Sequence, residues 1–125
     1  RQWVRTFEGH STQLFAVVFS HDGQRVITGS ADRTIKIWDT HTGECLHTLV
    51  GHEGWVSSLA LSPDGRLLAS GSVDNTVRLW NLQTLCCQQV LQKHSQWVLS
   101  VAFSPDGHWL VSSGNDEVLH FWTVE

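Results

Sequence analysis

Short apolar segments separated by turn sequences recur along this chain. Residues 14–20 (LFAVVFS), 56–62 and 98–104 are mostly apolar, and each is followed by a turn, HDG in the first case and SPDG in the other two. A short apolar run between turns predicts a strand that is buried on both faces. The residues 34–38 instead alternate, with Ile35 and Ile37 on one face and Lys36 and Trp38 on the other.

Two further strands complete each set. Residues 25–29, 66–71 and 109–113 are predicted to be second strands, followed by turns at ADRT, VDNT and NDEV, and the more mixed residues 45–49 are predicted to form an outer strand with one face in solvent. The glycines of the HDG and SPDG turns are expected to take a positive φ. Four strands with their turns fill each segment and leave no room for a helix, so the chain is predicted to be all-β.

The pattern repeats with a fixed period of 42 residues and no insertion. Each repeat carries a His, a Ser or Thr, an Asp and a Trp at the same spacing. These residues are His10, Thr28, Asp32 and Trp38, then His52, Ser70, Asp74 and Trp80, then His94, Ser112, Asp116 and Trp122. The Asp-Gly pairs at Asp22, Asp64 and Asp106 keep the same step.

This repeat resembles the WD-repeat β-propeller family along the whole chain. Gly-His opens the first two repeats and Lys-His the third, while Trp38-Asp39, Trp80-Asn81 and Trp122-Thr123 close them. A period of 40 to 45 residues with these signatures is typical of four-stranded propeller blades. The resemblance implies a single segment of three antiparallel blades, with repeats at 9–50, 51–92 and 93–125. Residues 1–8 are then expected to be the outer strand of a split blade, and the third repeat to lack its own.

The four repeated residues have the chemistry of a buried hydrogen-bond relay. A neutral imidazole can donate to the Asp carboxylate and accept from the hydroxyl, and that hydroxyl can accept from the indole N–H. The resemblance implies this structural role for all twelve residues. A catalytic His-Asp-Ser triad is the alternative, but the same trio occurs three times beside a Trp, which favours architecture over catalysis. No enzyme activity is therefore expected.

Neither metal nor cofactor is expected. Zinc is the metal alternative, because the chain has eight His, but neither the repeated His residues nor His41 and His47 have the close ligand spacing of a zinc site. Three cysteines, Cys45, Cys86 and Cys87, do not suggest a disulfide framework, and free thiols indicate a reducing, cytoplasmic compartment.

The net charge of the chain argues against nucleic acid as a partner. At −4 the chain lacks the excess of basic residues that nucleic-acid binding requires, and no apolar run is long enough for a membrane span. Proteins or peptides are the expected partners. The sequence shows no basic, hydrophobic leader, and its start at Arg1 without any Met suggests a trimmed segment of a longer chain.

The resemblance also indicates where a partner would bind, because propellers commonly bind at the channel mouth. The corresponding positions are Gln13, Phe15 and Ala31, then Trp55, Ser57 and Val73, then Trp97, Leu99 and Asn115. Their aromatic and apolar character is typical of a binding hot spot. The alternative is that Trp55 and Trp97 pack between blades, and their solvent exposure decides between the two.

Three blades cannot cover their own end faces. We expect head-to-tail copies to close a ring by giving residues 2–7, from Gln2 to Phe7, to the third blade of the next copy. A six-bladed dimer is favoured over a nine-bladed trimer. The rival is that these blades belong to a larger chain. The predicted function is a non-catalytic scaffold for protein-protein interaction, with an enzyme or a structural unit without a ligand as the other hypotheses.

Overall fold

Eleven β-strands and no helix make up the part of the chain that the computed structural model describes, residues 6–124. The strands are β1 (Leu14–Phe19), β2 (Arg25–Ser30), β3 (Thr34–Asp39), β4 (Cys45–Val50), β5 (Val56–Leu61), β6 (Leu67–Ser72), β7 (Val77–Asn81), β8 (Cys86–Leu91), β9 (Val98–Phe103), β10 (Trp109–Gly114) and β11 (Leu119–Thr123). Within these residues nothing helical is present that could cross a bilayer. The all-β prediction is confirmed, and the strands predicted from residue 14 onward differ from these bounds by one residue at most at either end.

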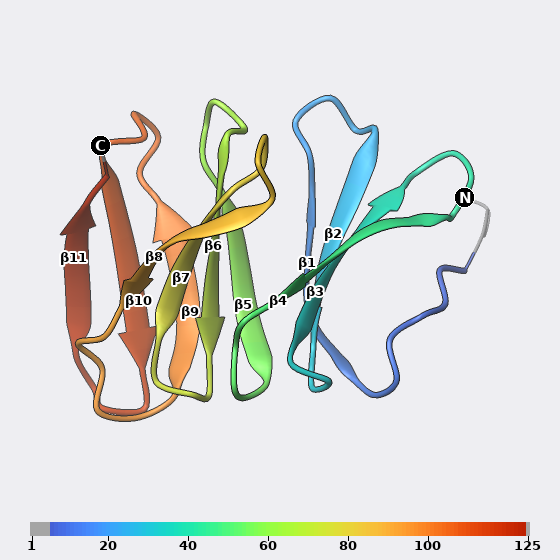
Figure 1. Cartoon of the computed structure of the whole chain (residues 1–125). Coiled ribbons are helices and arrows are strands. Elements are labelled where there is room, and N and C mark those ends of the chain that lie inside the picture. Colours follow the sequence, from blue (N-terminus) through green and yellow to red (C-terminus); the bar gives the residue numbers. More distant parts are fainter. Residues whose placement is uncertain (1–5, 125) are drawn as a thin grey trace, which may run out of the picture.

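Three antiparallel sheets stand side by side (Figure 1). Blade 1 has the order β1-β2-β3-β4, blade 2 the order β5-β6-β7-β8, and blade 3 has three strands in the order β9-β10-β11. Each strand pairs with its neighbour in sequence, so every blade is a simple meander. Among the described residues blade 3 has no fourth strand, and the ring is not closed.

The turns between the first two strands of each blade follow their sequence closely. Gly23, Gly65 and Gly107 have φ values of 72°, 75° and 78°, in the left-handed region that favours glycine. The amide of each glycine donates to the carbonyl of the serine three residues earlier. That serine also donates its hydroxyl to the turn aspartate, as Ser62 does to Asp64 at 2.7 Å. Local hydrogen bonds therefore fix these turns.

The hydrophobic cores lie between blades. The first joins blades 1 and 2 and comprises Ile27, Ile35, Ile37, Leu49, Val56, Leu59, Leu68 and Trp80. The second joins blades 2 and 3 and comprises Ala69, Val77, Leu79, Val98, Val101 and Leu110. Most of the buried apolar side chains thus lie where one blade covers another.

The prediction that all three first strands are buried on both faces is wrong for β1, and also for β9, where Leu99, Ser100 and Ala102 are exposed. Val17 in β1 is 64% exposed, whereas the equivalent Leu59 and Val101 are only 7% and 6% exposed. Leu59 and Val101 are covered by the preceding blade, and β1 has no preceding blade. The opposite end of the molecule is bare for the same reason, with Leu119 and Phe121 in β11 largely exposed.

The segment predicted to be exchanged lies mostly outside the described residues, which begin at Thr6. Phe7 stacks on Trp38 of blade 1, with ring centroids 5.7 Å apart and planes at 29°. Residues 6 and 7 are not part of a strand in this structure. The described start of the chain lies beside blade 1, at the opposite end of the molecule from β11 (Figure 1).

Candidate functional site

The four repeated residues of blade 2 form a continuous chain of hydrogen bonds. His52 Nδ1 lies 2.9 Å from Asp74 Oδ2, and His52 Nε2 lies 2.6 Å from Ser70 Oγ. The indole Nε1–H of Trp80 donates to the same hydroxyl at 2.8 Å. Because a carboxylate only accepts, the imidazole proton is on Nδ1, and the Ser70 hydroxyl therefore donates to Nε2.

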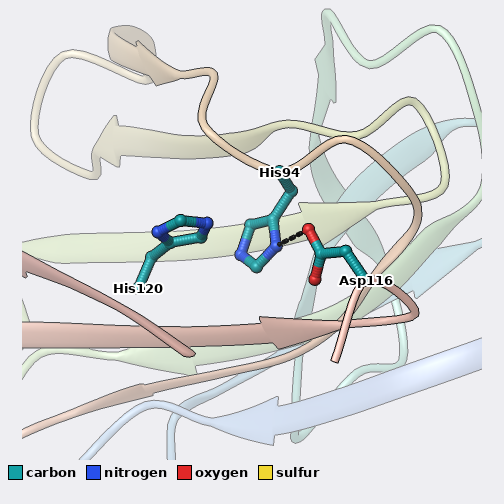
Figure 2. Close-up of side chains that lie close together, drawn as sticks. All are labelled: His94, Asp116 and His120. Carbon is teal, nitrogen blue, oxygen red and sulfur yellow. Dashed lines mark hydrogen bonds and ion pairs between the residues drawn. The ribbon is translucent and has the colours of Figure 1, made fainter. Parts of the chain in front are cut away.

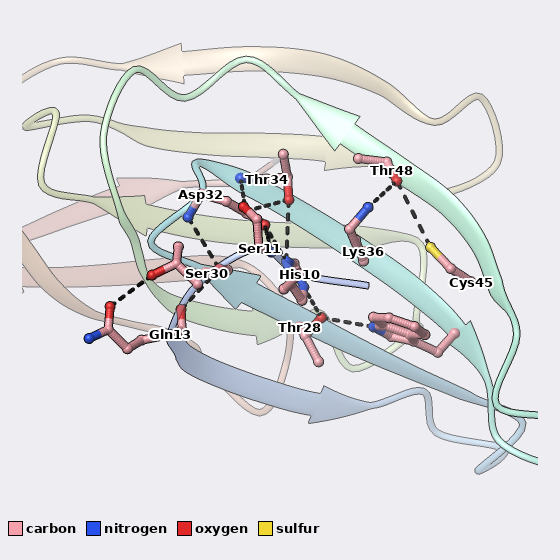
Figure 3. A network of polar contacts seen from close by, with 12 residues as sticks. His10, Ser11, Gln13, Thr28, Ser30, Asp32, Thr34, Lys36, Cys45 and Thr48 are labelled. Carbon is pink, nitrogen blue, oxygen red and sulfur yellow. Dashed lines mark hydrogen bonds and ion pairs between the residues drawn. The ribbon is translucent and has the colours of Figure 1, made fainter. Parts of the chain in front are cut away.

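The other two blades contain the same connections. In blade 1, His10 Nε2 lies 2.6 Å from Thr28 Oγ1, which accepts from Trp38 at 2.8 Å (Figure 3). In blade 3, the corresponding bonds of Ser112 Oγ to His94 and to Trp122 measure 2.8 and 2.9 Å. The histidine-to-aspartate bond is 2.9 Å in all three blades. The structure thus brings together all twelve residues of the predicted relay.

The relay aspartates are held in their charged form. Burial by itself raises the pKa of Asp74, but hydrogen bonds from His52, from Thr76 and from the backbone amide of Glu53 outweigh it and hold the pKa far below the ordinary 3.8. The pKa of Asp32 is lowered in the same way, against the effect of burial, by Thr34, His10 and backbone amides. Each carboxylate therefore ties the loop at the start of its blade to the turn before the third strand.

The relay hydroxyls are not accessible to a substrate. Ser70 and Ser112 are fully buried and Thr28 is 5% exposed. Each hydroxyl is already engaged by an imidazole and by an indole. A nucleophile must reach a substrate carbonyl or phosphoryl group, and these hydroxyls cannot. The geometry favours a structural relay over a catalytic triad.

A row of aromatic rings crosses the three blades at the predicted partner-binding positions. Phe15 stacks on Trp55 with centroids 5.2 Å apart and planes at 25°, and Trp55 lies 6.4 Å from Trp97 with planes at 44°. Phe15 is 44% exposed and each Trp is 47% exposed. The two indoles are therefore not packed away between blades. We call these three residues the aromatic row.

An apolar pocket of about 260 Å³ lies along the aromatic row. Its lining residues are Phe15, Trp55, Ser57, Val73, Trp97 and Leu99. The hydroxyl of Ser57 is already used within the protein, because it donates to the backbone carbonyls of Gly71 and Val98. The pocket surface that remains is almost wholly aromatic and aliphatic.

Three of the predicted positions do not line this pocket. Gln13 and Asn115 are exposed beside it, and Ala31 is half-buried. In each blade a backbone hydrogen bond joins the last of the three predicted positions to the first. The amides of Ala31, Val73 and Asn115 donate to the carbonyls of Gln13, Trp55 and Trp97, at 2.9 to 3.0 Å. The equivalent positions thus have the same backbone geometry in each blade and differ only in the side chain presented.

One group of polar residues was missed by the sequence reasoning. His120 of β11 lies against the relay of blade 3, beside His94, whose other side faces Asp116 (Figure 2). The spacing of these residues along the chain does not predict that they meet. His120 lies in β11, whereas His94 lies in the loop before β9. The available signal was a difference between repeats, since His120 stands where the other repeats have Lys36 and Arg78.

The three cysteines are free thiols, as the sequence analysis expects. Cys45, Cys86 and Cys87 form no disulfide in the structure, and Cys45 and Cys87 occupy equivalent positions opposite Trp38 and Trp80. Their thiols make only weak contacts with backbone carbonyls and neighbouring side chains. They form no site with another reactive group that the structure describes.

Comparison with known proteins gives relatives in several functional settings. The chain is 58% identical over 40 residues to the vegetative incompatibility protein HET-E-1 of Podospora anserina. The aligned residues cover 32% of this chain and 3% of that protein. It is 45% identical over 47 residues to the human WD repeat, SAM and U-box domain-containing protein 1, covering 38% of this chain and 10% of the relative. The chain therefore spans only a small part of these relatives.

Solved structures resemble the chain over almost its whole length. The structure of U3-55K superposes with a TM-score of 0.92 at 27% sequence identity, covering 96% of this chain and 38% of that one. The family model described as WD domain, G-beta repeat matches residues 1–39, 43–81 and 85–123. The chain belongs to the WD-repeat family, and its three sheets are consecutive blades of a β-propeller.

Proposed function

We propose that this chain is a non-catalytic platform that binds a protein or peptide through the aromatic row. The observation that carries the proposal is the continuity of Phe15, Trp55 and Trp97 across three blades, with nearly half of each ring exposed. Large rigid rings lose little conformational entropy on binding and are enriched among residues that dominate binding energy. A row of them on a rigid scaffold is suited to holding a partner.

The chemistry of the pocket selects the kind of partner. Its lining is apolar apart from Ser57, whose hydroxyl is already satisfied within the protein. A partner segment with one or two large aliphatic or aromatic side chains would bury that surface, and polar groups such as those of Gln13 and Asn115 would meet its backbone at the rim. Relatives named as subunits of complexes, including translation initiation factor 3 subunit I and THO complex subunit 6, support a role in assemblies.

Peptide selection tests this function directly. Peptides are selected from a random library on the intact chain, and their affinities are then measured for Trp55→Ala and Trp97→Ala. Each substitution is expected to weaken binding about 30-fold, since hot-spot residues contribute about 2 kcal/mol or more. Trp109→Ala is the matched control, because Trp109 is 45% exposed but lies in β10, outside the pocket.

The platform hypothesis fails under two results. One is a library that yields no peptide binder under conditions in which the chain is folded. The other is equal affinity for the three variants and the unsubstituted chain, because the selected peptides would then bind elsewhere. A chain that retains its fold but binds nothing supports the purely structural alternative.

We propose as a second function that the two bare end faces join copies of this chain. Ile35 and Ile37 of blade 1, like Val77 and Leu79 of blade 2, are almost fully buried against the next blade. The equivalent Leu119 and Phe121 of blade 3 are 60% and 65% exposed. A second copy presenting Leu14, Val17 and Phe19 of its blade 1 would continue the same type of interface.

The particle mass in solution tests this assembly. A dimer of six blades is expected, at twice the 14.1 kDa of one chain, with a trimer of nine blades as the other closed form. Multi-angle light scattering over a range of concentrations measures this. A folded monomer at every concentration would overturn the assembly and leave further blades of a longer chain as the partners of these faces.

A further inference from the structure

The relay of blade 3 departs from the other two at neighbouring positions. Val118 stands where blades 1 and 2 have Thr34 and Thr76, and His120 stands where they have Lys36 and Arg78. Both positions follow the relay aspartate, by two and by four residues. Each change alters which polar atoms are satisfied around Asp116.

The first change removes a hydrogen-bond donor. Thr34 donates its hydroxyl to Asp32 Oδ1 at 2.6 Å, and Thr76 donates to Asp74 Oδ1 at 2.5 Å. The side chain of Val118 cannot donate. Asp116 Oδ1 is buried and accepts no side-chain hydrogen bond from residues 6–124, although the backbone amide of Val118 still helps to lower the pKa of this carboxyl.

The second change turns a side chain inward. Lys36 Nζ reaches out to Thr48 of the outer strand β4, and an Arg78 guanidinium N–H points to Cys87 Sγ of β8. His120 instead lies edge-on to His94, with ring centroids 4.4 Å apart and planes at 83° (Figure 2). Its Nε2 is buried and, within the described part of the chain, has no hydrogen-bond partner.

These changes place two imidazoles and one carboxylate together. One ligand atom from each of His94, Asp116 and His120 lies within 4.8 Å of the other two. The two unpartnered atoms, Asp116 Oδ1 and His120 Nε2, both carry lone pairs when the carboxylate is charged and the imidazole is protonated on Nδ1. A cation held by the trio would give His120 Nε2 the partner that it lacks.

We propose that His94, Asp116 and His120 form a binding site for a divalent transition-metal ion, with Zn²⁺ the best match. Imidazole nitrogens and carboxylate oxygens are ligands that zinc prefers, at about 2.0 to 2.2 Å. Ligand atoms around such an ion are roughly 3.4 Å apart in tetrahedral geometry, so atoms that now lie up to 4.8 Å apart would approach by as much as about 1.4 Å through side-chain rotation. Water supplies the remaining position.

Metal binding would involve the relay itself. His94 Nδ1 now donates to Asp116 Oδ2, and His94 Nε2 accepts from Ser112. His94 must exchange one of these bonds for the metal, and if Nδ1 is the ligand its proton is released to solvent. The ion would then connect β11 to the loop before β9, and this link would stabilise the blade that lacks a fourth strand.

Zinc titration of the intact chain by isothermal calorimetry tests the site. The three thiols are first replaced by serine in every sample, since cysteine also binds zinc. One equivalent of Zn²⁺ is expected to bind with micromolar affinity and to raise the melting temperature by several degrees. Val118→Thr, which restores the donor to Asp116, is expected to weaken binding at least 10-fold.

Substitution of His120 decides the assignment. His120→Lys, the residue of blade 1, and His120→Gln are both expected to abolish the one-to-one binding, and circular dichroism shows whether each variant is folded. His108→Lys is the matched control, because His108 is exposed and lies outside the trio. Absence of zinc binding to the folded chain overturns the proposal and leaves a buried water as the bridge. Binding that survives in both His120 variants overturns it as well.

Discussion

Gly71 of β6 lies directly against Val98 of β9 in the next blade. A Cβ atom at Gly71 would come within 2.7 Å of Val98 Cγ1, and at Gly29 it would come within 2.6 Å of Val56 Cγ1. Real Cβ contacts are not this short, so the absence of a side chain allows the blades to approach. The equivalent residue of blade 3 is Ser113, where no described blade follows.

Gly71→Ala is therefore expected to destabilise the chain. The added methyl group forces Val98 or the backbone of blade 3 to shift, and overpacking of this kind costs about 1 to 3 kcal/mol. Chemical denaturation followed by tryptophan fluorescence measures the loss. Ser113→Ala is the control and is expected to change stability by less than about 0.5 kcal/mol.

Ser113→Gly is expected to strengthen self-association. In the proposed assembly this residue faces Leu14 of another copy, and its Cβ and hydroxyl keep the two sheets further apart than Gly71 does. Removing them permits the closer spacing of the internal interfaces. Sedimentation velocity should show a lower dissociation constant for the variant, and an unchanged constant would count against this mode of contact.

Asp74→Ala is expected to lower the free energy of unfolding by about 3 kcal/mol. It leaves His52 Nδ1, the Glu53 amide and the Thr76 hydroxyl without their acceptor, and each orphaned group that is shielded from water, as those of His52 and Thr76 are, costs about 1 to 3 kcal/mol. Thermal denaturation measures the change. Full retention of the melting temperature would show that the relay is not structural. Glu44→Ala, outside the relay, serves as the control.

Acid is expected to weaken the fold through the relay aspartates. The pKa values of Asp32 and Asp74 in the folded chain lie below the ordinary 3.8 that applies when it is unfolded. Their contribution to stability is therefore fully present above about pH 5 and is lost as the pH falls through 3.8 toward the folded-state pKa. Denaturation at a series of pH values measures this slope, which Asp74→Asn should reduce.

Two tryptophans are expected to differ sharply in their effect on stability. Trp80 is buried and donates to Ser70, so Trp80→Ala should cost about 3 to 5 kcal/mol. Trp97 is 47% exposed, and Trp97→Ala should cost far less. Urea midpoints of the two variants provide the comparison. Similar losses would mean that Trp97 contributes to the core rather than to a binding surface.

Much of the fold follows from spacing alone. The strands, the glycine turns and the residues of the relay recur every 42 residues, and each depends on contacts within one blade. His52 and Asp74, for example, are joined by a single meander of fixed length. Local strand pairing therefore determines where these side chains meet, and a repeat pattern is sufficient to predict it.

Other features depend on how blades stand against one another. The sequence of β1 does not reveal that Val17 is exposed, because β1 is at least as apolar as β5 and β9. The burial of such a strand depends on whether another blade covers it. The stacking of Phe15 on Trp55 is a contact between two sheets, and so depends on their spacing and angle.

The sequence by itself determined the repeat, the order of the strands and the partners within each relay, since hydrogen bonding along a meander follows chain connectivity. Only the tertiary structure decided which apolar faces are bare, that three rings form one row, and that His120 turns toward His94 and Asp116. These are matters of packing between sheets and of side-chain rotation, and a period along the chain does not specify either.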